Sequence, residues 1–527
     1  MVAELPEEGP AHLVEVLGAD DRPAWDDLAV SSQFRLRTRF PQPALDEADA
    51  ASAPQERDRE GREDLRAQLV FTIDPEDARD HDDALSVRPL ERGRFEVGIH
   101  IADVSHYVRP DSALDLEALA RGTSCYLPGG VVPMLPERLS ADLCSLRPDQ
   151  DRLALSVFVT LDAEGTLHHY RFAETVIRSC ARLDYGQVQR AIDGREALPA
   201  EVTQACNALL ALSRVLRRRR MEAGALALEV PEAKAWVGPD GVPIRIERRK
   251  HLESHELIEE FMLLANRCVG QEGARRESGM LFRVHESPVG RKLADLDTML
   301  KALGLPRLGS IKEPAEALQA LLRARVDPPR RRLLHRLVLR SLPRARYLDR
   351  DLGHFGLATW EYCHFTSPIR RYPDLHNHRR VREWIRGVPS AAWDPHALER
   401  LAVQCTAREQ DATDAEREGF KVKALRHLEG RLGERVSGTI TGLIPQGFFV
   451  ELDDAPVEGF VKPSLYLDDY FTLEPNGVCL QGRRSRRRFT LGDSVTITVA
   501  RVDVPARECD LALDAPPMRR GRHPRRR

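Results

Sequence analysis

The chain has 527 residues, a length that allows about three or four domains, and its hydrophobic fraction of 42% is ample for packed cores. A net charge of −3 does not by itself indicate a nucleic-acid-binding protein, and no apolar run reaches the roughly 18 to 20 residues that span a bilayer. The first residues lack the regions of a signal peptide, and nine scattered cysteines without a Cys-x-x-Cys pair disfavour zinc sites and disulfides, so we expect a cytoplasmic protein with reduced thiols.

The first 60 residues carry weak patterns. A strand-and-turn pattern covers residues 12–18, and an acidic, Ala-rich stretch at 45–64 indicates a linker or a short helix. We therefore treat residues 1–60 as an N-terminal segment that precedes the first large domain.

The segment 72–83 is strongly acidic and follows the apolar run 69–71. Its aspartates are Asp74, Asp77, Asp80, Asp82 and Asp83. Carboxylates this close together repel one another, and desolvating them is costly unless a cation compensates their charge. Mg²⁺ is held in proteins by a few carboxylates together with substrate phosphate, so the segment predicts a divalent-metal site in an ordered loop. A solvated acidic turn is the alternative, and a calcium loop is disfavoured because its Gly and terminal Glu are missing.

The next segments predict a strand and an irregular loop. Residues 95–104 alternate as a half-buried strand does, and we assign structural roles to His100 and His106. Tyr126 then precedes the Gly and Pro residues of 128–136, which fix a loop that presents its ring on turns. An exposed aromatic ring stacks on a nucleobase of any identity, at about 1–3 kcal/mol per base.

Periodicity predicts helices at 200–222, 252–268 and 398–430. In the second helix, Leu257, Phe261 and Leu264 lie on one apolar face. Glu259 and Glu260 flank that face, and two exposed structural carboxylates are the alternative to a role in substrate binding.

The segment 365–374 combines a proline with two arginines. Pro368 disfavours helix directly before it, so we expect a helix from about 369 with Arg370 in its first turn. A guanidinium there can fork onto a phosphate, helped by the positive end of the helix. His376 and His378 diverge by about 200° on a helix, which disfavours joint metal ligation.

Residues 432–515 contain short strands separated by Gly turns, which predicts a five-stranded OB barrel of the S1 type. Phe448 is either a core residue or a stacking platform, and we favour the platform. Arginines cluster in four places, at 217–220, 330–332, 483–488 and 519–527. We expect the third cluster in a long loop and the fourth in a disordered tail. Each run alone is typical of a solvated surface, but together around an acidic site they suit a polyanion that moves towards a metal.

In this order and spacing, the segments resemble the ribonuclease II and ribonuclease R family of 3′-to-5′ exoribonucleases over roughly residues 60–515. The resemblance rests on Asp74 with Asp80, Asp82 and Asp83, on 99–108, 126–136, 182–185 and 282–285, and on Thr366-Ser367-Pro368-Ile369-Arg370. It implies an RNB-type catalytic domain. Members of this family usually carry two cold-shock-type barrels before the catalytic domain, and 60 residues leave too little room for them.

The resemblance also implies roles for single residues. Mg²⁺ or Mn²⁺ is expected at Asp74, Asp80, Asp82 and Asp83, and the alternative for Asp82 is to orient the attacking water or the leaving-group proton. Arg370 is expected on the scissile phosphate, Tyr126 on the 3′-terminal base, Tyr185 at the scissile end and ribose, and Glu259 facing the ribose. Leu228 stands where the family often has a second aromatic of the base clamp.

The sequence thus predicts an α+β protein. Its expected parts are an N-terminal segment (1–60), an RNB-type domain (61–430), an all-β S1 barrel (431–515) and a basic tail (516–527). We expect a metal-dependent exoribonuclease that hydrolyses single-stranded RNA from its 3′ end to nucleoside 5′-monophosphates, as a monomer without membrane attachment. A catalytically silent RNA-binding protein of the same fold is the first alternative, and a metal phosphoesterase acting on nucleotides is the second.

Overall fold

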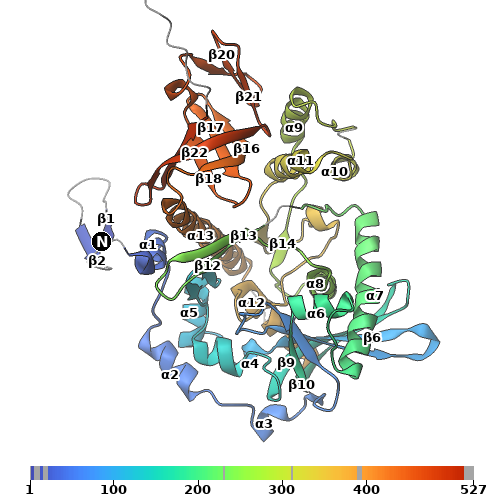
Figure 1. Cartoon of the computed structure of the whole chain (residues 1–527). Helices are drawn as coiled ribbons and strands as arrows, with labels where there is room; N and C mark the ends of the chain where they lie inside the picture. The colour runs from blue at the N-terminus through green and yellow to red at the C-terminus, as the bar shows by residue number, and fades with distance from the viewer. Residues whose placement is uncertain are drawn as a thin grey trace, which may run out of the picture.

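A computed structural model describes residues 2–4, 12–15, 22–229, 232–309, 312–388 and 394–514. A large domain of mixed sheet and helix lies below a small barrel, and the long helix α13 (Pro395–Glu429) leads from one to the other (Figure 1). The predicted α+β class is confirmed. The predicted tail, 516–527, lies outside the described residues.

A seven-stranded sheet forms the centre of the large domain, in the order β11-β4-β5-β6-β9-β10-β3. In that order the strands are β11 (Ala181–Asp184), β4 (Phe71–Asp74), β5 (Asp83–Pro89), β6 (Phe95–Ala102), β9 (Asp151–Leu161), β10 (Leu167–Arg178) and β3 (Glu63–Asp64). From β4 to β10 neighbouring strands are antiparallel, and β11 runs parallel to β4. Residues 97–102 of β6 are buried on both faces, so the strand predicted as half-buried is covered on both sides.

Separate hydrophobic cores cover the two faces of the sheet. On one face, α7 (Ala200–Glu222) and α8 (Glu253–Arg276) pack Leu209 and Phe261 against Ile99. On the other face, α2 (Gln42–Ala50) and α5 (Ala113–Arg121) share a core with Ala102 and Phe158. The helix predicted at 200–222 is confirmed, and the one predicted at 252–268 continues beyond its expected end.

Smaller elements surround this sheet. The helices are α1 (Asp26–Gln33), α3 (Glu56–Arg59), α4 (Val104–Tyr107), α6 (Tyr185–Ile192), α9 (Gly290–Ala302), α10 (Pro314–Leu322), α11 (Pro328–Ser341) and α12 (Tyr372–Ile385). Four strand pairs are β1 (Val2–Glu4) with β2 (His12–Glu15), β7 (Cys125–Leu127) with β8 (Gly130–Val132), β12 (Ala233–Val237) with β13 (Pro243–Arg248), and β14 (Phe282–Val284) with β15 (Arg346–Leu348). Helices α9, α10 and α11 pack around a leucine-rich core of their own.

The C-terminal barrel is closed, in the order β16-β17-β18-β23-β22, which confirms the five-stranded prediction. Its strands are β16 (Arg435–Ile444), β17 (Gly447–Leu452), β18 (Glu458–Val461), β22 (Ser494–Asp503) and β23 (Glu508–Leu513). A three-stranded sheet of β19 (Phe471–Leu473), β20 (Cys479–Gly482) and β21 (Arg488–Thr490) is inserted before β22. The long loop predicted around 483–488 is wrong, because residues 483–487 form a short turn between β20 and β21, and Arg488 begins β21.

Two further sequence predictions concern the whole chain. All nine cysteines are free thiols and eight of them are buried, as expected. Within the described ranges, no helix is both long and apolar enough to cross a bilayer.

Candidate active site

Three strand ends bring predicted site residues to one edge of the central sheet. Strand β4 ends at Asp74, and its antiparallel neighbour β5 begins at Asp83. Strand β11 runs parallel to β4 with Asp184 opposite Asp74, so Tyr185 begins α6 at the same edge. Burial raises the pKa of the Tyr185 phenol, and the charges of Asp83 and Asp74 raise it further. The edge therefore holds two facing carboxylates and one tyrosine.

Arg370 reaches this edge from a distant part of the chain. The Ile369 N–H donates to Asp82 Oδ1 at 2.9 Å, and Arg370 Nε lies 3.7 Å from Asp82 Oδ2. The Arg370 side chain is 44% exposed, which leaves its guanidinium accessible to a ligand. The predicted meeting of Arg370 with the acidic segment is therefore present.

The predicted position of Arg370 in a first helical turn is wrong. Helix α12 begins at Tyr372, so Arg370 lies in the turn before it. Pro373 occupies the first turn of α12, the helical position at which a missing N–H costs least. Arg370 is held instead by its backbone carbonyl, which accepts the Ser124 N–H at 2.9 Å.

Tyr126 lies beside the acidic segment on strand β7. Its hydroxyl donates to Asp80 Oδ2 at 2.8 Å, and the residue remains 38% exposed. Its backbone N–H donates to Glu416 Oε1 at 2.7 Å, which fixes the strand against α13. The sequence did not single out Glu416 because a contact across 290 residues leaves no local pattern.

The aspartates of the segment are only partly compensated by the protein. Burial raises the pKa of Asp82, and burial with the charge of Asp74 raises the pKa of Asp83 to about 8. Asp74 Oδ2 lies 2.8 Å from His81 Nδ1 without hydrogen-bond alignment, and Asp82 Oδ2 likewise finds no hydrogen-bond donor among the described residues. Asp77 points elsewhere, since Lys234 Nζ on β12 donates to it at 2.9 Å.

The oxygens of this segment supply part of a metal-binding set. Across the described ranges, no three His, Cys, Asp or Glu side chains form a ready set of ligands. Asp80 is bonded to Tyr126 and Asp82 to the Ile369 N–H, which leaves Asp74 and Asp83 as the facing pair. Buried carboxylate oxygens without a donor favour a cation, so the donor set fits a hard divalent ion that substrate and water oxygens complete.

The two glutamates of α8 face different surroundings. Glu260 is buried and pairs with Arg220 of α7, whereas the side chain of Glu259 is 53% exposed. Glu259 lies 3.7 Å from His251, whose ring stacks on that of His255. The His255 ring in turn stacks on Tyr185 at 4.1 Å, so Glu259 lies near the site edge. Leu228, expected at the base-clamp position, is partly buried against the core of α9, α10 and α11.

The histidines behave as structural residues. His100 is fully buried between the Ser86 and Ser156 hydroxyls, at 2.9 and 2.8 Å. His376 Nε2 and His378 Nε2 bind two different backbone carbonyls, those of Gly279 and Phe365. The expectation that the latter two do not share a metal agrees with these contacts.

Comparison with known proteins shows which family the chain belongs to. Residues 62–387 match the model described as RNB domain, and residues 430–513 match the S1 RNA binding domain. The chain belongs to the RNB family. It is 36% identical over 516 residues to ribonuclease R 1 of Lactococcus lactis, covering 96% of this chain and 63% of that protein. It is 37% identical over 501 residues to ribonuclease R of Aquifex aeolicus, covering 93% of this chain and 70% of that protein.

A solved RNB structure has the same arrangement. Mycoplasma genitalium RNase R in complex with ribose-methylated single-stranded RNA superposes with a TM-score of 0.90 at 28% identity, over 95% of this chain and 80% of that one. The chain thus spans less than two thirds of the Lactococcus relative but four fifths of the Mycoplasma structure.

In the S1 domain of this RNB protein, the stacking role predicted for Phe448 is wrong. Phe448 is fully buried and packs on Phe489, with ring centroids 4.7 Å apart. Side chains alternate along a strand, so Phe449 points outwards beside Phe460 of β18, with centroids 5.2 Å apart. This partly exposed pair lies on the outer surface of the barrel.

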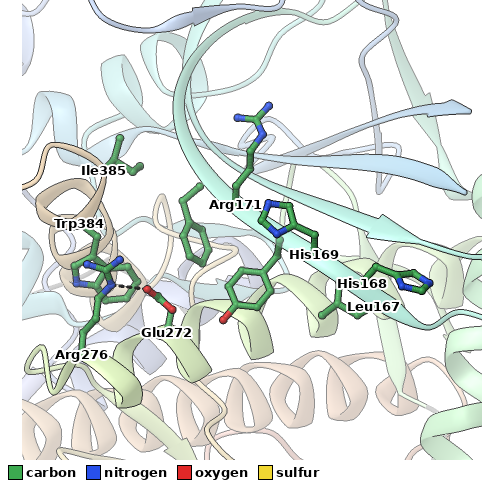
Figure 2. Close-up of a pocket in the computed structure, with 10 residues that line it drawn as sticks. Leu167, His168, His169, Arg171, Glu272, Arg276, Trp384 and Ile385 are labelled. Carbon is green, nitrogen blue, oxygen red and sulfur yellow. Dashed lines mark hydrogen bonds and ion pairs between the residues drawn. The ribbon is translucent and has the colours of Figure 1, made fainter. Parts of the chain in front are cut away.

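A cavity of about 590 Å³ lies in the RNB domain away from the aspartates (Figure 2). It is lined by β10, α8 and α12, and Arg276 pairs there with Glu272. Its β10 residues pair with the end of β9 near Leu161, whereas the aspartates lie at the opposite end of the strands. None of the predicted site residues lines this cavity.

Proposed function

We propose that this RNB protein is a processive 3′-to-5′ exoribonuclease that hydrolyses single-stranded RNA to nucleoside 5′-monophosphates. The relatives named ribonuclease R and the RNA-bound Mycoplasma structure support an RNA substrate. The observation that carries the proposal is the contact of Arg370 with Asp82, 3.7 Å apart, because it joins a phosphate-binding cation to the acidic segment.

The chain's own residues suit the end of an RNA strand. Arg370 would bind the scissile phosphate and offset the charge that builds up on its oxygens in the transition state. The exposed ring of Tyr126 would stack on the terminal base without reading its identity. Tyr185 and Glu259, near each other at the site edge, would contact the ribose, which is where RNA differs from DNA.

Mg²⁺ or Mn²⁺ would be held by Asp74 and Asp83, with Asp80 and Asp82 as the further predicted ligands. When bound, the ion supplies Lewis acidity and a lower pKa for the attacking water. Asp82 accepts the Ile369 N–H, so its carboxylate also fixes the Arg370 turn relative to the site. The Oδ2 atoms of Asp74 and Asp82, which accept no hydrogen bond from the described residues, support cation binding.

The S1 barrel would hold RNA upstream of the cleaved end. Phe449 and Phe460 lie side by side on its outer surface, and such a pair offers two ring faces to successive bases. Action as a monomer in the cytoplasm is part of the same proposal.

The proposal is tested by following a 5′-labelled single-stranded RNA incubated with the protein and Mg²⁺. We expect a ladder that shortens from the 3′ end, with 5′-monophosphates as the small product. An RNA that stays intact would favour the catalytically silent alternative, and internal cuts would contradict exonuclease action. Equal turnover of single-stranded DNA would contradict the ribose contacts alone.

A further inference from the structure

The turn between β20 and β21 carries a dense cluster of positive charge. Four arginines, Arg483, Arg484, Arg486 and Arg487, lie in the turn, Arg488 adjoins them as the first residue of β21, and all five are exposed. Two have carboxylate partners, Arg484 with Asp468 and Arg488 with Glu474. The turn therefore carries an excess of positive charge, on a chain whose net charge is −3.

This turn is held rigidly. The carboxylate of Asp469 accepts the backbone N–H groups of Tyr470, Arg484 and Ser485, at 2.7, 2.9 and 2.7 Å, and also the Ser485 hydroxyl. These bonds lower the pKa of Asp469, so its carboxylate keeps its negative charge. Gly482 N–H donates to the Arg487 carbonyl at 2.9 Å and closes the turn. The arginine side chains thus project from a fixed backbone.

One arginine occupies a position that suits another residue better. Arg486 has φ of 58°, in the left-handed region that glycine and asparagine adopt at lower cost. Arg92, in the turn between β5 and β6, has the same conformation with φ of 60°, so it offers a control position with a matching backbone.

An exposed aromatic ring adjoins the cluster. Tyr470 is 72% exposed, and its carbonyl accepts the Arg483 N–H at 2.8 Å. Guanidinium groups that neutralise phosphates, next to a ring that stacks on bases, are the combination by which proteins hold single strands. The cluster also belongs to the part of the chain that matches an S1 RNA binding domain.

We propose that this arginine turn is a second RNA-binding site, which takes the phosphate backbone of the single strand well upstream of the 3′ end. Figure 1 shows β20 and β21 at the upper tip of the molecule, far from β6 and β9 of the catalytic sheet. We therefore expect a short RNA seated in the active site to leave the turn free, and a long RNA to contact both. The inference rests on the proposed function, since it takes RNA as the substrate.

The test measures RNA affinity as a function of salt concentration, in EDTA so that binding is separated from hydrolysis. The variant is Arg486→Ser with Arg487→Ser, two arginines without a carboxylate partner in the described part of the chain. The matched control is Arg57→Ser with Arg92→Ser, which removes the same charge from exposed positions on α3 and the β5–β6 turn. Each protein is titrated with single strands of about 6 and about 30 nucleotides.

On the long RNA, we expect the slope of log affinity against log salt to be shallower by about 1.4 in the variant, since each lost phosphate contact lowers it by about 0.7. The short RNA and the control should keep the wild-type slope. An unchanged slope on the long RNA, or the same change with the short RNA or the control, overturns the proposal. Hydrolysis of the short RNA by wild type with Mg²⁺ is scored separately, so failure of the proposed function is recognised on its own.

Discussion

Asp82 and Asp103 are both almost fully buried in the RNB domain, 4% and 1% exposed, but their surroundings differ. Asp103 accepts Arg62 Nη2 at 2.6 Å and the Ser105 hydroxyl at 2.7 Å. Its neighbour Glu174 accepts two bonds from Arg386, both at 2.8 Å. Asp82, with Asp74 and Asp83 nearby, has one accessible arginine at 3.7 Å and one backbone donor, the Ile369 N–H, while its Oδ2 accepts no hydrogen bond from the described residues.

The electrostatic consequences are opposite. The arginines around Asp103 hold the pKa of that carboxyl well below its usual range, despite the opposing effect of burial. At the site edge, burial and like charge raise the pKa of Asp82 and Asp83. The domain therefore compensates the carboxylates that stabilise its fold, and it leaves those of the active site for a ligand to compensate.

The largest expected effect is the loss of activity in Asp83→Asn, which tests the active-site side of this comparison. Asp83→Asn keeps the side-chain shape but removes one charge of the facing pair, so we expect kcat for RNA hydrolysis to fall by about 10³-fold. The free energy of unfolding in EDTA should not decrease, because the repulsion with Asp74 is removed. Asp77→Asn is the matched control, since Asp77 belongs to the same segment but pairs with Lys234. A destabilised Asp83→Asn protein would break the comparison.

Asp103→Asn should have the opposite profile. Removing its charge leaves the buried Arg62 with Glu174 alone, at 3.4 Å, and we expect a loss of about 3 kcal/mol in the free energy of unfolding. Activity of the remaining folded protein should stay near wild type, as measured below the new transition temperature. An unchanged urea midpoint would show that the Asp103 group does not stabilise the fold.

A smaller effect is expected at Tyr126. Tyr126→Ala removes the ring, and RNA affinity should weaken by about 1–3 kcal/mol. Tyr126→Phe keeps the ring but releases Asp80 from its hydrogen bond, so affinity should be retained. Fluorescence anisotropy in EDTA distinguishes the two, and equal loss in both variants would assign the effect to the hydroxyl instead.

The last expected effect is a pH dependence of stability without metal. The folded-state pKa of Asp83 lies above its unfolded value, so the folded state binds more protons. Stability should therefore fall as pH rises from about 4 towards 8, and Asp83→Asn should lose this slope. Asp103, with its lowered pKa, contributes stability above its unfolded pKa that is lost as pH falls below about 4. Urea unfolding at several pH values in EDTA measures both slopes.

Much of the site could be predicted from local sequence. The spacing of the aspartates and the Thr-Ser-Pro-Ile-Arg segment indicated residues that the fold brings together, and helical periodicity predicted α7 and the start of α8. Motif spacing and helical periodicity are set by residues close together in the sequence, so they can be recognised without the structure.

The rest depends on contacts that local patterns do not record. Phe448 and Phe449 are adjacent, and only the pairing of β17 with β18 decides which of them points into the barrel. Glu416 positions Tyr126, and His81 lies against Asp74. Both contacts are created by the folded structure and leave no pattern in the sequence. The start of α12 at Tyr372 depends on the Arg370 turn, which Asp82 and Ser124 hold from distant segments.

The central claim, that the site carboxylates await a cation, is tested most directly by Mn²⁺ binding measured with electron paramagnetic resonance. Wild type, Asp83→Asn and the control Asp77→Asn are titrated without RNA, so the result does not depend on activity. The account predicts that wild type and Asp77→Asn bind Mn²⁺ and that Asp83→Asn loses this binding. Equal binding by all three proteins, or no binding by wild type, would contradict it.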